Sequence, residues 1–202
     1  MKIIGITGPS GAGKSIFSDF LAERGIPVIN ADELYHSLLI PPSHCLDLIR
    51  GAFGDGVFNA DGTLSRPELA KIVFSSEEKL ELLNSTVLSV VIDESKRIIS
   101  ELETKGERVV AIDAPTLIES GFDKECDTVV SIISDAATRA KRISERDKIS
   151  ESDALRRISA QKPDSFYEEH SDSVIFNDGD LESFEAAFEQ IYASLIQQES
   201  AK

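Results

Sequence analysis

The feature that most constrains this chain is its beginning, where an apolar run leads into a glycine-rich turn that ends in Lys-Ser. Lys2 to Thr7 (KIIGIT) has the length and composition of a buried strand, and apolar residues recur at helical spacing after Lys14. The turn from Gly8 to Ser15 reads GPSGAGKS and fits G-x-x-x-x-G-K-[ST] in the strand–turn–helix context that this pattern requires. We therefore expect an α/β fold with a phosphate-binding loop at one edge of a parallel sheet.

The residue types in this loop suit the binding of a nucleotide. Glycines let successive backbone N–H groups turn toward phosphate oxygens, and the N-terminus of the next helix adds a partial positive charge. Lys14 is expected to reach the β- and γ-phosphates of ATP, and the Ser15 hydroxyl to bind Mg²⁺. An incidental glycine-rich turn is the alternative, and the position of the turn after a strand argues against it.

The remaining strands are predicted from short apolar runs, which are typical of parallel sheets covered on both faces. They are PVIN (27–30), RVVAID (108–113), DTVVSII (127–133) and SVIFN (173–177), and helical patterns follow the last two at 136–146 and 181–195. Between them, residues 46–102 have helical spacing that is interrupted by a loop at 51–65. Ser65 and Glu68 stand at capping-box spacing with Pro67 between them, which predicts the start of a helix.

Composition excludes several classes of protein. The 36 acidic and 21 basic residues give a net charge of -15, which repels nucleic acid and anionic membranes alike. No apolar stretch approaches the roughly 20 residues of a membrane helix, and the N-terminus lacks the zones of a secretory signal. Cys45 and Cys126 lie outside any CxxC motif and are expected to be reduced, structural residues. We expect a cytoplasmic protein, with no nucleic-acid or membrane partner.

Basic residues are concentrated in one segment. Residues 139–162 hold eight of the 21 basic residues and four of the 36 acidic ones. Such a run is either the solvated face of two helices or a mobile lid that supplies arginine to a transferred phosphoryl group. Arg142 and Arg146 are four residues apart, so one helix face presents both of them and they can converge on one ligand.

Absent motifs narrow the use of the nucleotide. The chain has neither N-K-x-D nor D-x-x-G, which excludes a Ras-like GTPase, and it is short for a motor-type ATPase. A small-molecule kinase remains, and it needs an acceptor site at the carboxyl edge of the sheet. Asp32, just after the second strand, is a candidate general base for an acceptor hydroxyl and a candidate N-cap of a helix at 33–39, and the two roles are compatible. Asp113 ends a central strand and is either a Walker-B-like residue that holds Mg²⁺ through water or a cap of the next turn.

Nearly the whole sequence resembles the dephospho-CoA kinase family. The stretches that carry the resemblance are, in order, ITGPSGAGKS, PVINADELYH, LSRPELAKIVF, AIDAPTLIESGFD, KRISERDKISESDALRRISAQ and SDSVIFNDGDLE. The resemblance implies transfer of the γ-phosphoryl group of ATP, with Mg²⁺, to the ribose 3′-hydroxyl of dephospho-CoA, the last step of coenzyme A biosynthesis.

The resemblance also implies a three-layer P-loop fold with a five-stranded parallel sheet. One domain would span residues 1–202, with a core (about 1–31, 107–137 and 171–200), a helical CoA-binding insertion (about 32–106) and a lid (about 138–170). It implies nucleotide binding by Gly8, Gly11, Ala12, Gly13, Lys14, Ser15, Ile16 and Asn177, with Asn177 beside the adenine. It places Asp32, His36, Arg66 and Asp113 at the acceptor side, with Asp32 as base and Arg142 and Arg146 as lid arginines.

Three departures from the family pattern stand out. Asn30 replaces an aspartate and leaves Asp32 as the base, Ile16 replaces a threonine, and Leu88-Ser89 replaces His-Pro. Two rival functions stay open: a kinase of another small hydroxyl or nucleoside monophosphate acceptor, and a non-catalytic ATP-sensing module. A monomer and a small homo-oligomer are both compatible with the sequence.

Overall fold

The structure, a computed structural model, describes residues 1–197. The chain divides into two compact units, one formed by residues 1–28 together with the chain from residue 107 onward, the other by residues 29–106. Each unit has a hydrophobic core of its own. None of the helices formed by residues 1–197 is long and apolar enough to cross a membrane.

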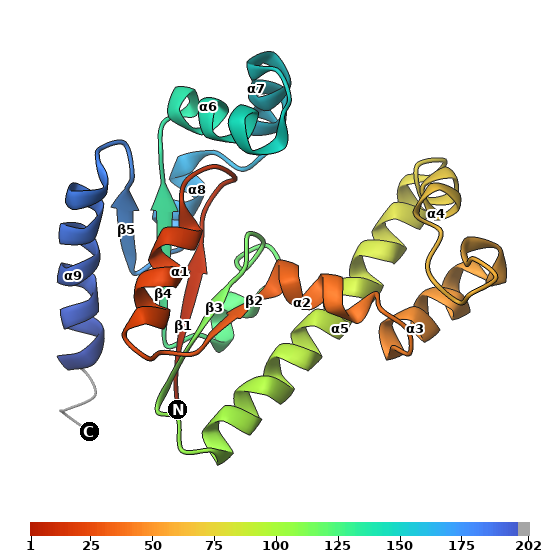
Figure 1. The fold of residues 1–202 in the computed structure, drawn as a ribbon, viewed down its shortest axis with the longest axis horizontal. Helices are drawn as coiled ribbons and strands as arrows, with labels where there is room; N and C mark the ends of the chain where they lie inside the picture. The colour runs from red at the N-terminus through yellow and green to blue at the C-terminus, as the bar shows by residue number, and fades with distance from the viewer. Residues whose placement is uncertain (198–202) are drawn as a thin grey trace. The chain divides into compact units, whose positions relative to one another are not determined.

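A five-stranded sheet carries the glycine-rich loop (Figure 1). Its strands are β1 (Lys2–Thr7), β2 (Val28–Asn30), β3 (Val109–Asp113), β4 (Thr128–Ile133) and β5 (Ser173–Phe176), in the order β2-β3-β1-β4-β5. β1 pairs in parallel with β3 and with β4, and β4 in parallel with β5. In this register Ile6 lies beside Asp113 on one side and beside Val130 on the other. The α/β class and the five strands predicted from apolar runs are confirmed.

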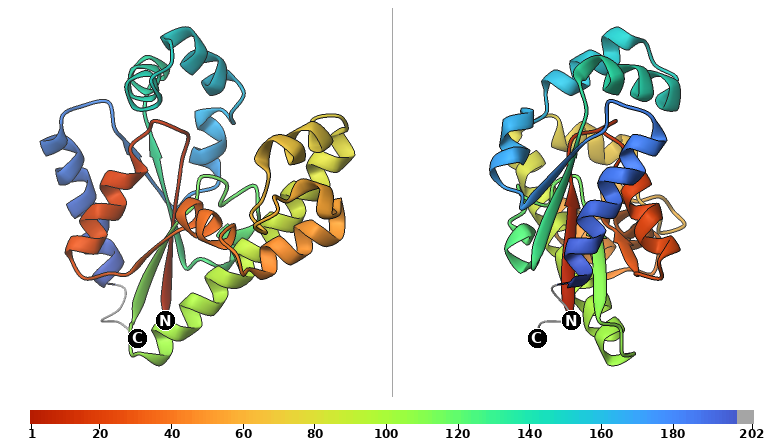
Figure 2. Two further views of the ribbon diagram at one scale, coloured as in Figure 1. Left: turned by 45° about the vertical axis from the view of Figure 1, so that its right-hand side comes forward. Right: turned by 90° about the vertical axis from the view of Figure 1, so that its left-hand side faces the viewer.

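Helices cover both faces of the sheet, as the edge-on view in Figure 2 shows. On one face α1 (Lys14–Glu23) and α9 (Leu181–Gln197) pack against Ile4 and Ile6 of β1. Phe17 of α1 meets Phe188 of α9 edge to face, with 5.0 Å between ring centroids. On the other face Tyr167 of α8 (Asp164–Glu169) packs with Ile118 and Ile133, beside the short helix η2 (Phe122–Glu125). The alternation of strand residues between two cores gives the three-layer arrangement.

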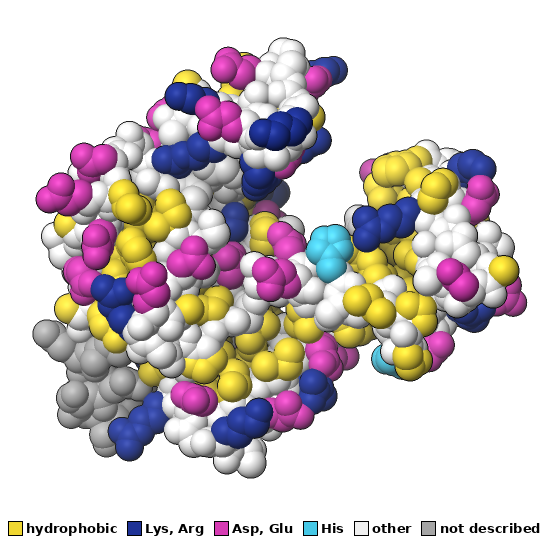
Figure 3. All heavy atoms as spheres, in the orientation of Figure 1, with side chains coloured by type: hydrophobic (Ala, Val, Ile, Leu, Met, Phe, Trp, Pro, Cys, Tyr) yellow, Lys and Arg dark blue, Asp and Glu magenta, His cyan; other side chains and the backbone are white. Residues whose placement is uncertain are grey.

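The basic segment forms two helices, α6 (Ala136–Asp147) and α7 (Glu151–Ser159), where Figure 3 shows several Lys and Arg side chains. Asp135 caps α6 and Ser150 caps α7, each by accepting hydrogen bonds from backbone N–H groups of the first turn. A small apolar cluster of Ala140, Ile143 and Ala154 joins the two helices. The six-residue helix α8 was not predicted, because it is too short to show a helical period.

The second unit is helical. It contains α2 (Ala31–Leu38), α3 (His44–Phe53), η1 (Asp55–Val57), α4 (Arg66–Val73) and α5 (Glu77–Thr104). Its core includes Cys45, Ile49, Leu69 and Val90. The predicted loop at 51–65 begins later, because α3 continues to Phe53. α4 starts after Ser65 as predicted, with Pro67 in its first turn, but the Ser65 side chain makes no capping hydrogen bond.

Candidate active site

The loop from Gly8 to Ser15 follows β1 and leads directly into α1. Gly8, Gly11 and Gly13 all have positive φ angles (134°, 80° and 101°), a region that favours glycine. An added Cβ at Gly8 would collide with the carbonyl oxygen of Ile132, and one at Gly13 with the side-chain amide of Asn177. Backbone conformation and close contacts with β4 and the end of β5 therefore both require these two glycines.

Three successive carbonyl oxygens of the loop accept hydrogen bonds from side chains outside it. Arg139 Nε donates to Ser10 O (3.0 Å), and Arg142 Nη1 donates to Gly11 O (3.3 Å) and Ala12 O (3.4 Å). Asn177 Nδ2 also donates to Ala12 O, at 2.8 Å. In a planar trans peptide the next N–H points opposite to the carbonyl. Holding Ser10 O and Ala12 O thus directs the next N–H groups, those of Gly11 and Gly13, to the opposite side, an orientation that suits phosphate, whereas the Ala12 N–H donates to Pro9 O at 3.3 Å.

Arg142 brings a positive charge to this loop. Besides the two loop carbonyls, its guanidinium donates to Ser134 Oγ (3.4 Å) and to the backbone oxygen of Asn177 (3.1 Å). Among the residues that the structure describes, its hydrogen-bond partners are all neutral oxygens. Arg146, one helical turn later, pairs with the carboxylate of Asp147 at 2.8 Å. Arg142 and Arg146 therefore have different surroundings, although they share a helix face.

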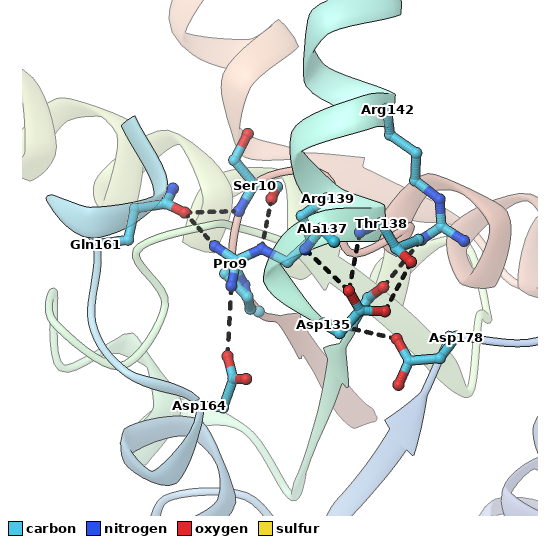
Figure 4. Close-up of polar contacts among 12 residues, drawn as sticks. Pro9, Ser10, Asp135, Ala137, Thr138, Arg139, Arg142, Gln161, Asp164 and Asp178 are labelled. Carbon is cyan, nitrogen blue, oxygen red and sulfur yellow. Dashed lines mark hydrogen bonds and ion pairs between the residues drawn. The ribbon is translucent and has the colours of Figure 1, made fainter. Parts of the chain in front are cut away.

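The charge of Asp135 is held at the start of α6. Its carboxylate accepts the N–H groups of Ala137 and Thr138 and the Thr138 hydroxyl, as Figure 4 shows. These donors hold the pKa of the Asp135 carboxyl below its ordinary value, because they stabilise the ionised form. The N–H of Asp135 in turn donates to Asp178 Oδ1 at 2.7 Å, which ties the start of α6 to the loop after β5.

The first turns of α1 offer oxygen ligands for a cation. Lys14 Nζ donates to Gly8 O at 2.8 Å, so its side chain lies back along the loop. Ser15 is exposed, and Asp113 is buried at the end of β3, where its Oδ2 accepts a hydrogen bond from Ser18 Oγ at 2.9 Å. Hydroxyl and carboxylate oxygens are the hard donors that Mg²⁺ prefers, so Ser15 and Asp113 each carry an oxygen of the type that binds magnesium. No group of three His, Cys, Asp or Glu residues able to hold a metal occurs within residues 1–197.

Of the expected acceptor residues, Asp113 lies in the first unit and the others, Asp32, His36 and Arg66, lie in the second. Asn30, not Asp32, is the N-cap of α2, since its Oδ1 accepts the N–H groups of Asp32 (3.0 Å) and Glu33 (3.1 Å). The N-cap alternative for Asp32 is therefore wrong, and its exposed carboxylate has no capping role. His36 lies one turn further along α2, with its ring 5.4 Å from that of Tyr35.

Tyr35 is a candidate that the sequence did not single out. Burial raises the pKa of its phenol, and the positive charge of Arg66 opposes that rise. The residue that begins α4 thus lies in electrostatic reach of α2, and the second unit brings Tyr35 and Arg66 together. No pattern in the sequence links these two residues, because their proximity depends on the folded arrangement of this unit.

A glycine-rich loop between the first strand and the first helix of a parallel sheet, with arginines converging on it from a helix after β4, defines a P-loop kinase fold. A family model described as dephospho-CoA kinase matches residues 2–183. The chain therefore belongs to the dephospho-CoA kinase family, and it is a kinase that acts in coenzyme A biosynthesis.

Comparison with single proteins agrees with this assignment. A dephospho-CoA kinase of Corynebacterium glutamicum is 35% identical over 196 residues, which cover 97% of this chain and 98% of the relative. The crystal structure of TT1252 from Thermus thermophilus is 29% identical with a TM-score of 0.79, over 96% of this chain and 97% of that one. The dephospho-CoA kinase from Campylobacter jejuni, 22% identical, has the same fold with a TM-score of 0.71, over 98% of this chain and all (100%) of that one.

Proposed function

We propose that this protein transfers the γ-phosphoryl group of ATP to the ribose 3′-hydroxyl of dephospho-CoA, giving CoA and ADP. The observation that carries the proposal is the loop whose carbonyls are held outward by Arg139, Arg142 and Asn177, in a chain whose family match spans residues 2–183. Phosphoryl transfer needs positioning and charge neutralisation more than covalent chemistry from the protein. The loop and the arginines that surround it supply both.

On the donor side, the N–H groups of the loop and the Lys14 ammonium bind the phosphates of ATP. Ser15 and Asp113 hold Mg²⁺, which neutralises charge on the β- and γ-phosphates when it is bound. Ile16, in the first turn of α1, presents its backbone to the phosphates. Asn177 supports this site from outside, since its buried side chain is bound to the Ala12 carbonyl. We propose that the loop that begins at Asn177 borders the adenine.

On the acceptor side, Asp32 accepts the proton of the attacking hydroxyl as general base. Its carboxylate is exposed, and Asn30 caps the helix in its place, so the Asp32 carboxylate is available to accept a proton. His36 and Arg66 bind the acceptor, and the cationic Arg66 suits one of its phosphates. We assign the acceptor site to the unit of residues 29–106 and the lid to residues 138–170.

Arg142 and Arg146 have separate duties in this proposal. Arg142 meets neutral oxygens at the loop, so its charge is available to the phosphoryl group in transfer. Arg146 is paired with Asp147 and contributes when the lid changes its contacts. Closure of the lid would exclude water from the γ-phosphate and so suppress hydrolysis of ATP.

The test is an ADP-release assay with Mg·ATP that compares dephospho-CoA with AMP, CMP, shikimate, gluconate and no acceptor. We expect turnover with dephospho-CoA alone, and CoA as the product by mass spectrometry. Equal or faster turnover with another acceptor would mean a different small-molecule kinase. ATP binding without acceptor-dependent ADP would instead support the nucleotide-sensing alternative.

A further inference from the structure

The backbone carbonyl and the backbone N–H of Ser10 both form hydrogen bonds with side chains that are distant in the sequence, those of Arg139 and Gln161. Arg139 Nε donates to Ser10 O at 3.0 Å, and Gln161 Oε1 accepts the Ser10 N–H at 3.3 Å. The two side chains also join each other, since Arg139 Nη2 donates to the same Gln161 oxygen at 2.7 Å. Figure 4 shows this closed set of contacts, with Asp164 on the other side of the guanidinium at 3.4 Å.

Burying the charged guanidinium of Arg139 beside the loop has a cost in desolvation free energy. The residue is 3% exposed, and burial lowers the pKa of its guanidinium. Its ion-pair partner Asp164 keeps 43% of its side chain exposed, so the pair is only partly shielded from water. An apolar side chain of similar volume often serves stability as well as a buried ion pair does. Packing alone therefore does not account for a charged fork at this position.

The backbone of Arg139 also touches the loop. A Cβ added to Gly11 would lie 3.0 Å from Arg139 O and 3.2 Å from Arg139 Cα, so the first turn of α6 rests directly against the glycine. Arg139 thus meets two neighbouring loop residues, Ser10 through its side chain and Gly11 through its backbone. These contacts fix the peptide that joins them, whose N–H belongs to Gly11.

We propose that Arg139 is a positioning residue that acts through Ser10 and, with Gln161 as its second arm, sets the conformation in which the loop binds the β-phosphate. The inference rests on the proposed function in that it concerns the same nucleotide site. Arg139 differs from Arg142 in kind: its charge is engaged by Gln161 and Asp164, whereas the guanidinium of Arg142 meets neutral oxygens.

The experiment compares Arg139→Leu, Arg139→Lys and Gln161→Ala with the wild type. Arg156→Leu is the matched control, since Arg156 lies on α7 with 79% of its side chain exposed. Calorimetry measures the affinities for ADP and AMP, which differ by the β-phosphate, and steady-state kinetics give KM for ATP and for dephospho-CoA. Thermal unfolding without nucleotide reports stability separately.

Losing a hydrogen bond from a charged group corresponds to about a tenfold change in affinity or more. We expect Arg139→Leu to weaken ADP binding by about that factor relative to AMP and to raise KM for ATP with KM for dephospho-CoA unchanged. Arg139→Lys, which keeps the charge but lacks the forked guanidinium, should have an ADP affinity between those of the wild type and Arg139→Leu. Arg156→Leu should match the wild type in all of these.

An equal loss of ADP and AMP affinity, or no loss of either, would overturn the proposal and leave Arg139 a structural residue. Should Arg139→Leu fail to fold, Gln161→Ala decides, because it removes the acceptor of the Ser10 N–H and keeps Arg139. The binding measurements need no acceptor. A wild-type enzyme that does not phosphorylate dephospho-CoA would thus refute the proposed function without deciding the role of Arg139.

Discussion

At the scale of single residues, the structure separates side chains that hold the site from those that are available for chemistry. Asn177, expected in the loop beside the adenine, holds the carbonyl of Ala12 with its amide. Asp32 was a possible helix cap, and Asn30 takes that role. The substitution of an aspartate by Asn30 in the family pattern therefore has a local explanation, since an asparagine oxygen caps a helix as well as a carboxylate does.

Replacing the base tests the assignment of Asp32. We expect Asp32→Asn to lower kcat by about 10² to 10⁴, the usual worth of a general base, while affinity for ATP changes little. Glu33→Gln is the matched control, because Glu33 is the next exposed carboxylate on α2. A kcat within tenfold of the wild type would move the role of base to another carboxylate, with Asp113 the first to examine.

Arg142 and Arg146, the arginines of the proposed lid, should not be equivalent. Both Arg142→Ala and Arg146→Ala are expected to lower kcat more than they weaken acceptor binding, and Arg142→Ala should have the larger effect because Arg142 reaches the loop directly. Removing one charge-assisted contact to a phosphoryl group costs about 10² or more in rate. Single-turnover kinetics with a Lys141→Ala control would check this. An equal rise in KM alone for both variants would show that they only attract the substrates.

At the scale of elements, strands were easier to predict than the contacts between helices. Five apolar runs predicted five strands, because a strand buried on both faces needs continuous apolar sequence. The helix α8 and the contacts of Arg139 were not predicted, the first for a local reason and the second for a long-range one. α8 is too short for a period, and Ser10 and Gln161 are 151 residues apart, so that only the folded chain brings them together.

The cap of α6 should make stability depend on pH. The pKa of Asp135 is lowered from 3.8 in the folded protein by the Thr138 hydroxyl and by backbone N–H groups. Its stabilising effect is therefore complete above the unfolded value and is lost as the pH falls through the folded one. Urea unfolding of Asp135→Asn, which keeps a capping oxygen but no charge, and of wild type should differ at pH 7 and converge only as the pH falls below the lowered pKa of Asp135, which is itself under 3.8. A difference that persists there would contradict this, and Glu145→Gln is the control on the same helix.

At the scale of the whole molecule, a chain of net charge -15 binds polyanionic substrates by local means. Lys14, Arg142 and the loop N–H groups act within the Debye length, about 10 Å at 0.1 M salt. Raising NaCl from about 0.1 to 0.5 M should weaken ADP binding several-fold and leave adenosine binding unchanged. Stopped-flow association rates that climb steeply at low salt would instead indicate long-range steering.

The chain leaves the sheet after Asn30 and returns to it at Val109, and β2 and β3 are neighbours, with the Pro27 carbonyl accepting the N–H of Ala111 at 2.9 Å. The whole segment between these two strands is inserted at a single place in the sheet, between β2 and β3. Lengthening or shortening such an insertion costs little closure entropy and leaves the order of the strands intact. Residues 31–106 can therefore be exchanged as one insertion in evolution, so that the proposed acceptor site changes while the nucleotide-binding loop is kept.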